Sequence, residues 1–484
     1  MKVELAGLNI DARIVRELGE KFPEIKDSLT PETLSASYAR ISRSKKSIAR
    51  LREEAVKEVE RARKSNTNII FRMGHASVAE HAAFNFDVTG ISRYAVEYIQ
   101  GFRLVSFTEK SQRYVLFEKE FYIPEEIENE KTRFLRGEYV TVVEKLASIY
   151  TKLYRLLIEA GVDDEKAKED SRYATSLSTL TQFGMTLNAR NLEYMIVRLK
   201  SSPLLELKRF ASSLYESVKD IVPSLVKYVD EDPYYSEFYP EPRVAGDISL
   251  EDRSVGSNIN REKVYPEVEL IDFDQDGEAR VIASLLFSMG SEEYKSYYKS
   301  YVDKTLQREA KEYLIPFFSK MKAFHPLPRV FEMTSLIFQI ELSASAFAQL
   351  KRHRMATIIA QSYDPELGFT LPPTVGDAGA GKLIEEAYNI STELFYRLAK
   401  SLPRVAPYVL TNAHRRRVVV RLDIRELYHI SRLREDIHAQ WEIREVARRM
   451  VSLAKEKYPL LMSLACGKDA FERTKSGMDL TIEV

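Results

Sequence analysis

Two widely separated stretches of the chain alternate apolar and polar residues. The apolar positions in both are spaced by two: Phe84, Phe86 and Val88 in the first stretch, and Leu336, Phe338, Ile340 and Leu342 in the second. A period of two predicts β-strands with one buried face.

Each alternating stretch is followed by apolar residues at helical spacing. These positions are Val142, Leu146, Ile149 and Leu153 in the first half, and Ile384, Ala387, Leu394 and Leu398 in the second. A period close to 3.6 predicts one amphipathic helix in each half.

The two halves also match each other residue by residue. Residues 103–114 (RLVSFTEKSQRY) align without gaps with residues 354–365 (RMATIIAQSYDP), and residues 171–192 align without gaps with residues 406–427. A repeat of this length that occurs twice indicates duplicated domains rather than a solenoid. We therefore predict a first copy at residues 1–230 and a second copy at 265–484, joined by a linker at 231–264 that is rich in Pro, Gly, Ser and acids.

Composition changes this picture little. The chain has 484 residues, enough for two or three domains, and 44% hydrophobic with 30% charged residues is typical of a soluble globular protein. Lys plus Arg and Asp plus Glu both number 72, which argues against a general nucleic-acid binder. No apolar run approaches a membrane span, so neither nucleic acid nor a membrane is expected as a partner.

The single cysteine and a run of three arginines allow two further predictions. The lone cysteine, Cys466, cannot form an internal disulfide, and it predicts a reducing, cytoplasmic location. The basic run Arg415–Arg417 is interpreted as a solvated face or as a partner for nearby acids. No metal site is predicted.

Two incomplete motifs suggest where chemistry occurs. The second copy has Arg352-His353-Arg354 without a Ser-x-Arg after it, and the first copy has Ser111-Gln112-Arg113 without an Arg-His-Arg before it. Arginines together with Ser, Gln and His can hold a phosphate and a planar heterocycle, although a structural ion-pair network is the alternative. Two complementary half-motifs predict one composite site, built from residues of both copies.

The order of the motifs resembles a known family. His75-x-Ser77-x-x-Glu80, then Arg103-x-x-Ser106 and Ser111-x-Arg113, are similar to the signature of the flavin-dependent thymidylate synthases, R-H-R-x-x-S followed by S-x-R. The stretches from Arg172 to Arg190 and from Arg425 to Arg444 resemble a later motif of that family. Together these matches cover most of both halves.

The resemblance implies an α/β (α+β) fold with two tandem domains, each a mainly antiparallel sheet with packed helices. Members of the family assemble as homotetramers that bind FAD and dUMP at subunit interfaces. A duplicated chain is therefore expected to form a homodimer that acts as a pseudo-tetramer.

Position by position, the resemblance also implies roles for residues. The nucleotide-binding residues are Gln349, Glu109, Ser111, Arg113 and Arg352, and the catalytic arginines are Arg352, Arg172 and Arg434. The cofactor-binding residues are His75, Ser77, Glu80, Asn188, Arg190, His353 and Arg354.

Each copy has lost the complementary part of the site. The second copy lacks the nucleotide-binding residues of the first: in place of Glu109, Ser111, Arg113 and Arg172 it carries Ala360, Ser362, Asp364 and Pro407. The first copy lacks the motif around Arg352-His353-Arg354 and carries Glu97, Gly101 and Phe102 in that region. In addition, Glu80 and Arg103 are 23 residues apart (103 − 80), whereas Glu332 and Arg354 are 22 apart (354 − 332). One extra helical residue would turn the following side chains by about 100°, so this wall of the first copy is expected to be non-functional.

The chemistry implied by the resemblance is reductive methylation of dUMP, with a methylene group from a reduced folate (methylene-tetrahydrofolate) or an analogue and hydride from FAD reduced by NADPH. The family uses no enzymatic nucleophile, which agrees with interpreting Cys466 as a core residue, and arginines would stabilise negative charge on the uracil ring. The alternatives are an FAD- and pyrimidine-nucleotide-binding paralogue with a different flavin reaction, and a catalytically silent scaffold.

Overall fold

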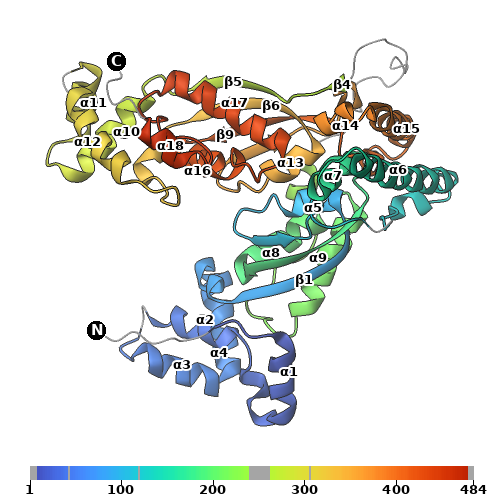
Figure 1. The fold of residues 1–484 in the computed structure, drawn as a ribbon. Coiled ribbons are helices and arrows are strands. Elements are labelled where there is room, and N and C mark those ends of the chain that lie inside the picture. Colours follow the sequence, from blue (N-terminus) through green and yellow to red (C-terminus); the bar gives the residue numbers. More distant parts are fainter. Residues whose placement is uncertain (1–7, 42–43, 118–119, 239–261, 305–306, 478–484) are drawn as a thin grey trace. The chain divides into compact units, whose positions relative to one another are not determined.

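Two separate antiparallel sheets, one from each copy, form the framework of the protein (Figure 1). The structure is a computed structural model that describes residues 8–41, 44–117, 120–238, 262–304 and 307–477. It divides into two units that do not follow the linear halves of the chain. Unit 1 contains Met1–Ser111, Glu120–Arg133 and Ser178–Glu241, and unit 2 contains Gln112–Lys119, Phe134–Leu177 and Pro242–Val484.

The sheet of unit 1 has three strands in the order β1-β3-β2, all antiparallel. Their bounds are β1 Ala83–Ser92, β2 Ser106–Glu109 and β3 Leu180–Asn188. The helices of this unit are α1 Ala12–Lys21, α2 Glu32–Ala39, α3 Ile48–Lys57, α4 Val59–Thr67, α5 Arg93–Ile99, α8 Ala189–Lys200 and α9 Leu205–Val218.

Unit 2 contains a four-stranded antiparallel sheet in the order β5-β6-β9-β7 and a short parallel pair, β4 and β8. The strands are β4 Glu262–Lys263, β5 Glu267–Phe273, β6 Leu336–Ser343, β7 Thr357–Ala360, β8 Phe369–Thr370 and β9 Arg415–Leu422. The helices are α6 Phe134–Glu159, α7 Asp164–Ser171, α10 Gly277–Met289, α11 Tyr294–Val302, α12 Gln307–Lys320, α13 Ala344–Leu350, α14 Pro373–Asp377, α15 Gly381–Ala399, α16 Ile424–Arg434, α17 Trp441–Lys457 and α18 Phe471–Ser476.

The elements expected from periodicity are confirmed. The alternating stretches form β1 and β6, and the helical stretches lie within α6 and α15. The apolar residues of β6 are fully buried, whereas Phe84, Phe86 and Val88 of β1 are only half-buried. Among the described residues, no helix is long and apolar enough to cross a membrane. The predicted domain boundaries remain a prediction, and residues 239–261 of the predicted linker lie outside the described ranges.

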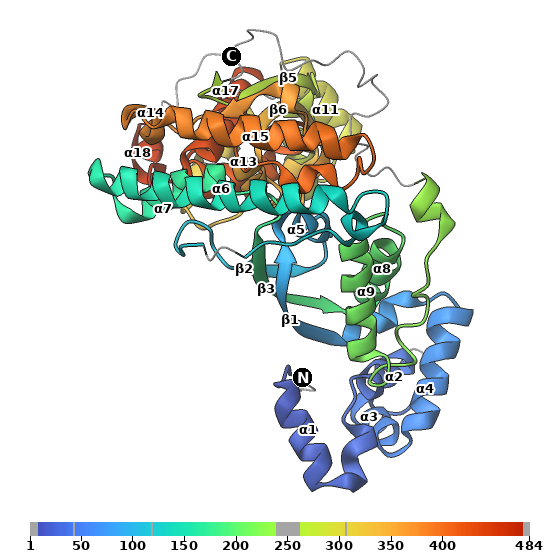
Figure 2. The ribbon, with the colours of Figure 1, turned by 90° about the vertical axis from the view of Figure 1, so that its right-hand side faces the viewer.

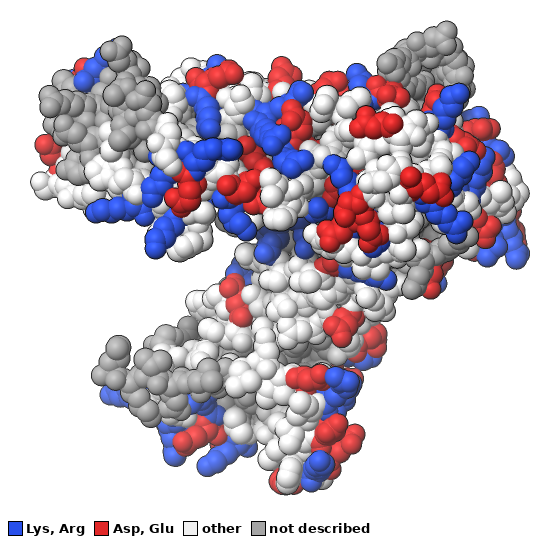
Figure 3. Space-filling view, viewed as in Figure 1, with Lys and Arg blue, Asp and Glu red and all other residues white. Residues whose placement is uncertain are grey.

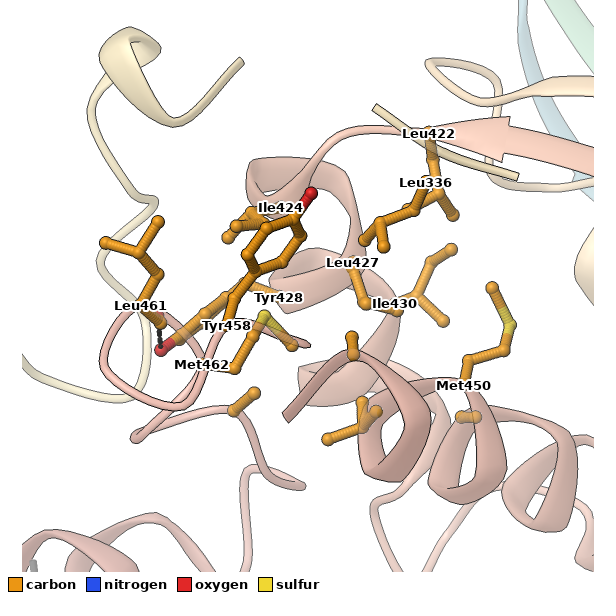
Figure 4. Packing of buried hydrophobic residues seen from close by; sticks show 14 of the residues in the cluster. Leu336, Leu422, Ile424, Leu427, Tyr428, Ile430, Met450, Tyr458, Leu461 and Met462 are labelled. Carbon is orange, nitrogen blue, oxygen red and sulfur yellow. Dashed lines mark hydrogen bonds between the residues drawn. The ribbon is translucent and has the colours of Figure 1, made fainter. Parts of the chain in front are cut away.

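The core of unit 2 forms where α16 and α17 pack against the sheet (Figure 4). Leu336 and Leu422 of the strands meet Leu427, Ile430 and Met450 of the helices in one buried cluster. Burial of apolar side chains is the main favourable contribution to the folding of a domain. This core fixes α16, whose last residue is Arg434.

A second core joins the two copies within unit 2. Helix α6 of the first copy lies beside α15 of the second (Figure 2), and Leu146 and Leu153 are buried in the same cluster as Ile384 and Ala387. Two ion pairs link the same helices, Lys145 with Glu386 at 2.6 Å and Arg397 with Glu138. The first copy thereby contributes α6, α7 and Arg172 to the unit that holds the second copy's sheet.

The extra residue of the first copy lies in strand β1 and not in a helix, so the expected turn of about 100° was wrong. The expectation that this wall of the first copy is non-functional stays a prediction. Gly90 is left unpaired between Thr89 and Ile91 of β1, with φ +70°, and it forms a β-bulge. A bulge absorbs one residue within the strand, and glycine adopts a positive φ without steric cost. Helices α5 and α13 therefore begin at equivalent positions, after Ser92 and Ser343, and have the same length of seven residues.

Both copies start that helix in the same way. Ser92 accepts a hydrogen bond from Ala95 N and donates its hydroxyl to Glu206, which also accepts the amide of Ser92. In the second copy Ser343 caps α13 and makes the same two contacts with Glu442. In both copies, therefore, a serine caps the helix and a buried glutamate holds that serine in place. This arrangement is shared by the two duplicated domains.

Candidate functional site

Three arginines from both copies come together in unit 2. Arg113 is in the first-copy segment 112–117, Arg352 follows α13, and Arg434 ends α16. Burial, together with the positive charges of Arg352 and Arg113, lowers the pKa of Arg434 from 12.5 to about 10. Burial is the larger cause of this shift, and the like charges of Arg352 and Arg113 add to it. An anionic ligand would offset the repulsion among these guanidinium groups. We call these three residues the arginine cluster.

Arg113 is anchored by two groups. Its Nε forms an ion pair with Glu169 of α7, and its Nη2 donates a hydrogen bond to the carbonyl oxygen of His438 at 2.9 Å. Glu169 belongs to the first copy and is only 6% exposed, whereas His438 belongs to the loop between α16 and α17. The position of Arg113 is thus defined by both copies.

Arg172 is a buried residue of the same unit. It lies directly after α7, and its carbonyl oxygen accepts a hydrogen bond from Asn412 Nδ2 at 3.1 Å. The same amide donates to Thr175 Oγ1 at 2.8 Å and to Gln112 Oε1 at 3.4 Å. Asn412 therefore ties Gln112, the neighbour of Arg113, to the backbone of Arg172.

His353 contacts Arg434 directly. Arg434 Nε donates to His353 Nε2 at 2.9 Å, so that nitrogen carries a lone pair and the ring proton is assigned to Nδ1. Burial, then the charge of Arg434 and of His429, lowers the pKa of His353 well below 6.5. His353 is thus a neutral acceptor that orients Arg434, while its predicted contact with a cofactor stays a prediction.

The remaining predicted residues of the second copy lie beside this cluster in sequence. Gln349 is half-buried on α13, and within the described part of the chain its Nε2 is a buried donor with no hydrogen-bond partner. Arg354 is half-buried, and its amide bonds to the carbonyl oxygen of Arg352. A buried amide donor without a partner is costly in a folded protein and fits a polar ligand.

The predicted nucleotide ligands Glu109 and Ser111 belong to unit 1. Glu109 accepts hydrogen bonds from Gln100 Nε2 at 3.0 Å and Thr181 Oγ1 at 3.2 Å, and it pairs with Arg93. Its carboxylate is therefore engaged by three first-copy side chains. Ser111 is half-buried at the end of this unit's segment.

The predicted cofactor residues of the first copy gather at one end of the unit 1 sheet. His75 and Ser77 are exposed just before β1, and Asn188 ends β3 opposite Ala83 and caps α8. Arg190, in the first turn of α8, pairs with Glu80 at 2.5 Å. The structure brings these five residues together, which sequence order alone did not guarantee.

The interpretation of Arg415–Arg417 as a solvated face was wrong for two of its residues. Arg415 is fully buried and donates to the carbonyl oxygens of Tyr265 and Glu341. Arg416 is 4% exposed, whereas Arg417 is exposed and pairs with Glu341 at 3.1 Å. On the described surface seen in Figure 3, basic and acidic side chains are interspersed.

Sequence patterns missed Glu169, Asn412 and the pair formed by Asp170 and Trp441. Asp170 Oδ1 accepts from Trp441 Nε1 at 3.0 Å, and Oδ2 accepts from Thr374 Oγ1 at 2.5 Å. Asp170 is fully buried, and this burial raises its pKa from 3.8 to about 6. Trp441 stands in the stretch from Arg425 to Arg444 that resembles a family motif, but no role was predicted for it. Glu169, Asp170 and Asn412 stand in none of those motifs, and only their tertiary contacts identify them.

Comparison with known proteins gives two matches to one family. The family described as "Thymidylate synthase complementing protein" matches residues 24–224 and 269–460, one match in each copy, which confirms the predicted duplication. A flavin-dependent thymidylate synthase of Clostridium tetani is 26% identical over 224 residues, covering 44% of this chain and 88% of that protein.

A longer relative spans both copies. The UPF0159 protein of Thermoplasma acidophilum is 23% identical over 453 residues, covering 82% of this chain and 87% of that protein. Among solved structures, the flavin-dependent thymidylate synthase of Helicobacter pylori complexed with FAD and dUMP has 20% identity and a TM-score of 0.31, covering 42% of this chain and 96% of that one.

Proposed function

The chain belongs to the thymidylate synthase complementing protein family, and from this premise we propose that it is a flavin-dependent thymidylate synthase with one composite site per chain. The reaction would be reductive methylation of dUMP to dTMP. A reduced folate or an analogue would supply the methylene group, and NADPH would reduce the flavin.

The observation that carries this proposal is the arginine cluster. Arg113 comes from the copy that lacks the Arg-His-Arg motif, and Arg352 and Arg434 come from the copy that lacks Ser-x-Arg. All three lie in unit 2, where the charges of Arg113 and Arg352 both act on Arg434. A phosphate monoester is the kind of ligand that relieves repulsion among guanidinium groups through forked, charge-assisted hydrogen bonds.

Each residue of the cluster has a proposed task. Arg113 would bind the phosphate, and Gln349 would donate its buried amide to the nucleotide. Arg352, Arg172 and Arg434 would face the uracil oxygens and stabilise negative charge that develops on the ring, a form of electrostatic catalysis worth several kcal/mol. Because His353 holds Arg434 at Nε, the direction of that guanidinium is set before ligand binds.

Bound flavin would supply hydride. The exposed polar residues at the end of the unit 1 sheet fit a polar cofactor, since His75, Ser77 and the Glu80–Arg190 pair offer both donors and acceptors there. We propose that these residues and Asn188 hold FAD in unit 1. His353 and Arg354, which belong to unit 2, keep their proposed role as cofactor-binding residues there.

No cysteine nucleophile takes part in this mechanism. Cys466 is 8% exposed, and its sulfur lies 3.1 Å from Arg432 Nη1 in the loop after α17. Packing with Arg432 rather than with the arginine cluster supports a structural role.

The test begins with the visible spectrum of the purified chain, followed by titration with dUMP and an assay for dTMP with NADPH and methylene-tetrahydrofolate. Bound flavin, a spectral shift on adding dUMP and formation of dTMP are expected. Flavin binding without methylation would favour a paralogue with another flavin reaction, and a chain that binds neither ligand would be a scaffold. We also expect a homodimer, and light scattering that gives a monomer would contradict it.

A further inference from the structure

Glu169 pairs with one member of the arginine cluster, Arg113, where a carboxylate would be expected to compete with an anionic ligand. It forms an ion pair with Nε of Arg113 and is 6% exposed. The carbonyl oxygen of His438 accepts from Nη2 of the same guanidinium at 2.9 Å. A guanidinium is planar with a rigid fork of donors, so the ion pair at Nε and the hydrogen bond at Nη2 together restrain its direction.

The helix that carries Glu169 is itself fixed. The next residue, Asp170, is fully buried and bonds to Thr374 of α14 and Trp441 of α17. Beyond it, Tyr173 donates to Glu442 at 2.7 Å. These contacts attach α7 and the turn after it to second-copy elements, so Glu169 is a rigid anchor rather than a mobile surface acid.

We propose that Glu169 is a positioning residue that orients Arg113 for anion binding, rather than a competitor that the ligand must displace. This inference rests on the proposed nucleotide site and deepens it. Without Glu169, the repulsion between Arg113 and Arg434 would act on Arg113 unopposed by this anchor, and the side chain would sample more rotamers. Ordering it again would then weaken ligand binding.

Two substitutions separate the roles. Glu169→Gln keeps an acceptor for Arg113 Nε, whereas Glu169→Ala removes the anchor. Binding of dUMP, measured by isothermal titration calorimetry on the full-length chain, is expected to weaken about 10-fold or more in Glu169→Ala and to recover to within about 3-fold of wild type in Glu169→Gln. If both variants bind dUMP as tightly as wild type or more tightly, Glu169 is not a positioning residue.

Controls exclude a general effect on the helix. Glu165→Gln makes the same charge change at an exposed position of α7 and should leave the affinity unchanged. The emission of Trp441, the single tryptophan of the chain, should be the same in all variants because its partner Asp170 is untouched. In a double-mutant cycle, Glu169→Ala should have no further effect once Arg113 is alanine, and an additive effect would overturn the proposal.

Inorganic phosphate distinguishes failure of this inference from failure of the proposed function. If wild type binds phosphate but not dUMP, the nucleotide assignment fails, and the same Glu169 series is then decided with phosphate as the probe. If wild type binds neither anion, both proposals fall together.

Discussion

Residues 111–114 of the first copy correspond to residues 362–365 of the second, and their side chains make different contacts. In the first copy Gln112 bonds to Asn412, and Arg113 pairs with Glu169 within the arginine cluster. In the second copy the equivalent residues are Tyr363, which is fully buried, and Asp364, which caps a short helical turn.

In the second copy, Arg416 packs against Tyr363 of this segment and against Phe347 of α13. The guanidinium of Arg416 lies 4.4 Å from the ring centre of Tyr363 and 4.5 Å from that of Phe347. It also donates to the carbonyl oxygen of Gln361. Stacking and hydrogen bonding of this kind stabilise a packed core, so the region contributes to folding where the first copy contributes to the proposed ligand site.

The framework around these segments has not diverged in the same way. Ser92 with Glu206 and Ser343 with Glu442 make the same contacts in the two copies. Divergence has therefore changed the residues that would face a ligand while the helix start that supports them is kept.

The largest expected effect follows from removing either side of the composite site. Arg113→Ala and Arg352→Ala should each weaken dUMP binding by about 100-fold or more, because each removes charge-assisted hydrogen bonds that the other copy does not supply. Calorimetric titration measures this loss.

The matched control is Asp364→Asn at the second-copy position equivalent to Arg113. Its side chain can still cap the turn, and dUMP affinity should not change. Normal dUMP binding by either alanine variant would show that the two copies do not share one site.

A pH experiment tests the contact between α7 and the second copy. Burial raises the pKa of Asp170 from 3.8 to about 6 in the folded chain, so between these values the folded state binds more protons than the unfolded state. Stability should therefore fall as the pH rises from 4 to 6, by about 3 kcal/mol at most, and be constant above that range for this group. Urea unfolding at several pH values should show that slope in wild type and lack it in Asp170→Asn. An identical slope in both would contradict the assignment to Asp170.

The shared framework should respond equally in both copies. Ser92→Ala and Ser343→Ala are each expected to destabilise the chain by about 1–2 kcal/mol through loss of a helix cap and a buried hydrogen bond. Thermal unfolding followed by circular dichroism measures the cost. A substantial cost in one copy and none in the other would show that the framework has diverged as well.

Cys466→Ser should have the smallest effect. A serine hydroxyl can accept the hydrogen bond from Arg432, so stability should change by about 1 kcal/mol or less and dTMP formation should be retained. An inactive but folded Cys466→Ser variant would instead indicate thiol chemistry.

Much of this architecture follows from local patterns. The strands at Phe84 and Leu336, the helices at Leu146 and Ile384 and the duplication itself could be predicted because they depend on periodicity and on matching residues. The position of the extra residue could not, because an alignment gap shows only that one residue is added between Glu80 and Arg103. Backbone pairing identifies it as Gly90.

The site could be predicted in part for a related reason. Arg113, Arg352 and Arg434 stand in recognisable motifs, whereas Glu169 and Asn412 matter only through contacts with residues far away in the sequence. The run of three arginines was misleading because equal charges suggest equal exposure. Strand alternation separates the buried Arg416 from the exposed Arg417, and Arg415 is buried where it donates to backbone carbonyl oxygens.

Ligand stoichiometry is the most direct test of a single composite site per chain. Calorimetric titration of the flavin-loaded chain with dUMP should give one nucleotide bound per chain, with Arg113→Ala and Arg352→Ala each weakening binding at that same site by about 100-fold or more. Two nucleotides per chain, with each substitution removing only one, would mean that each copy has its own site and would contradict the account.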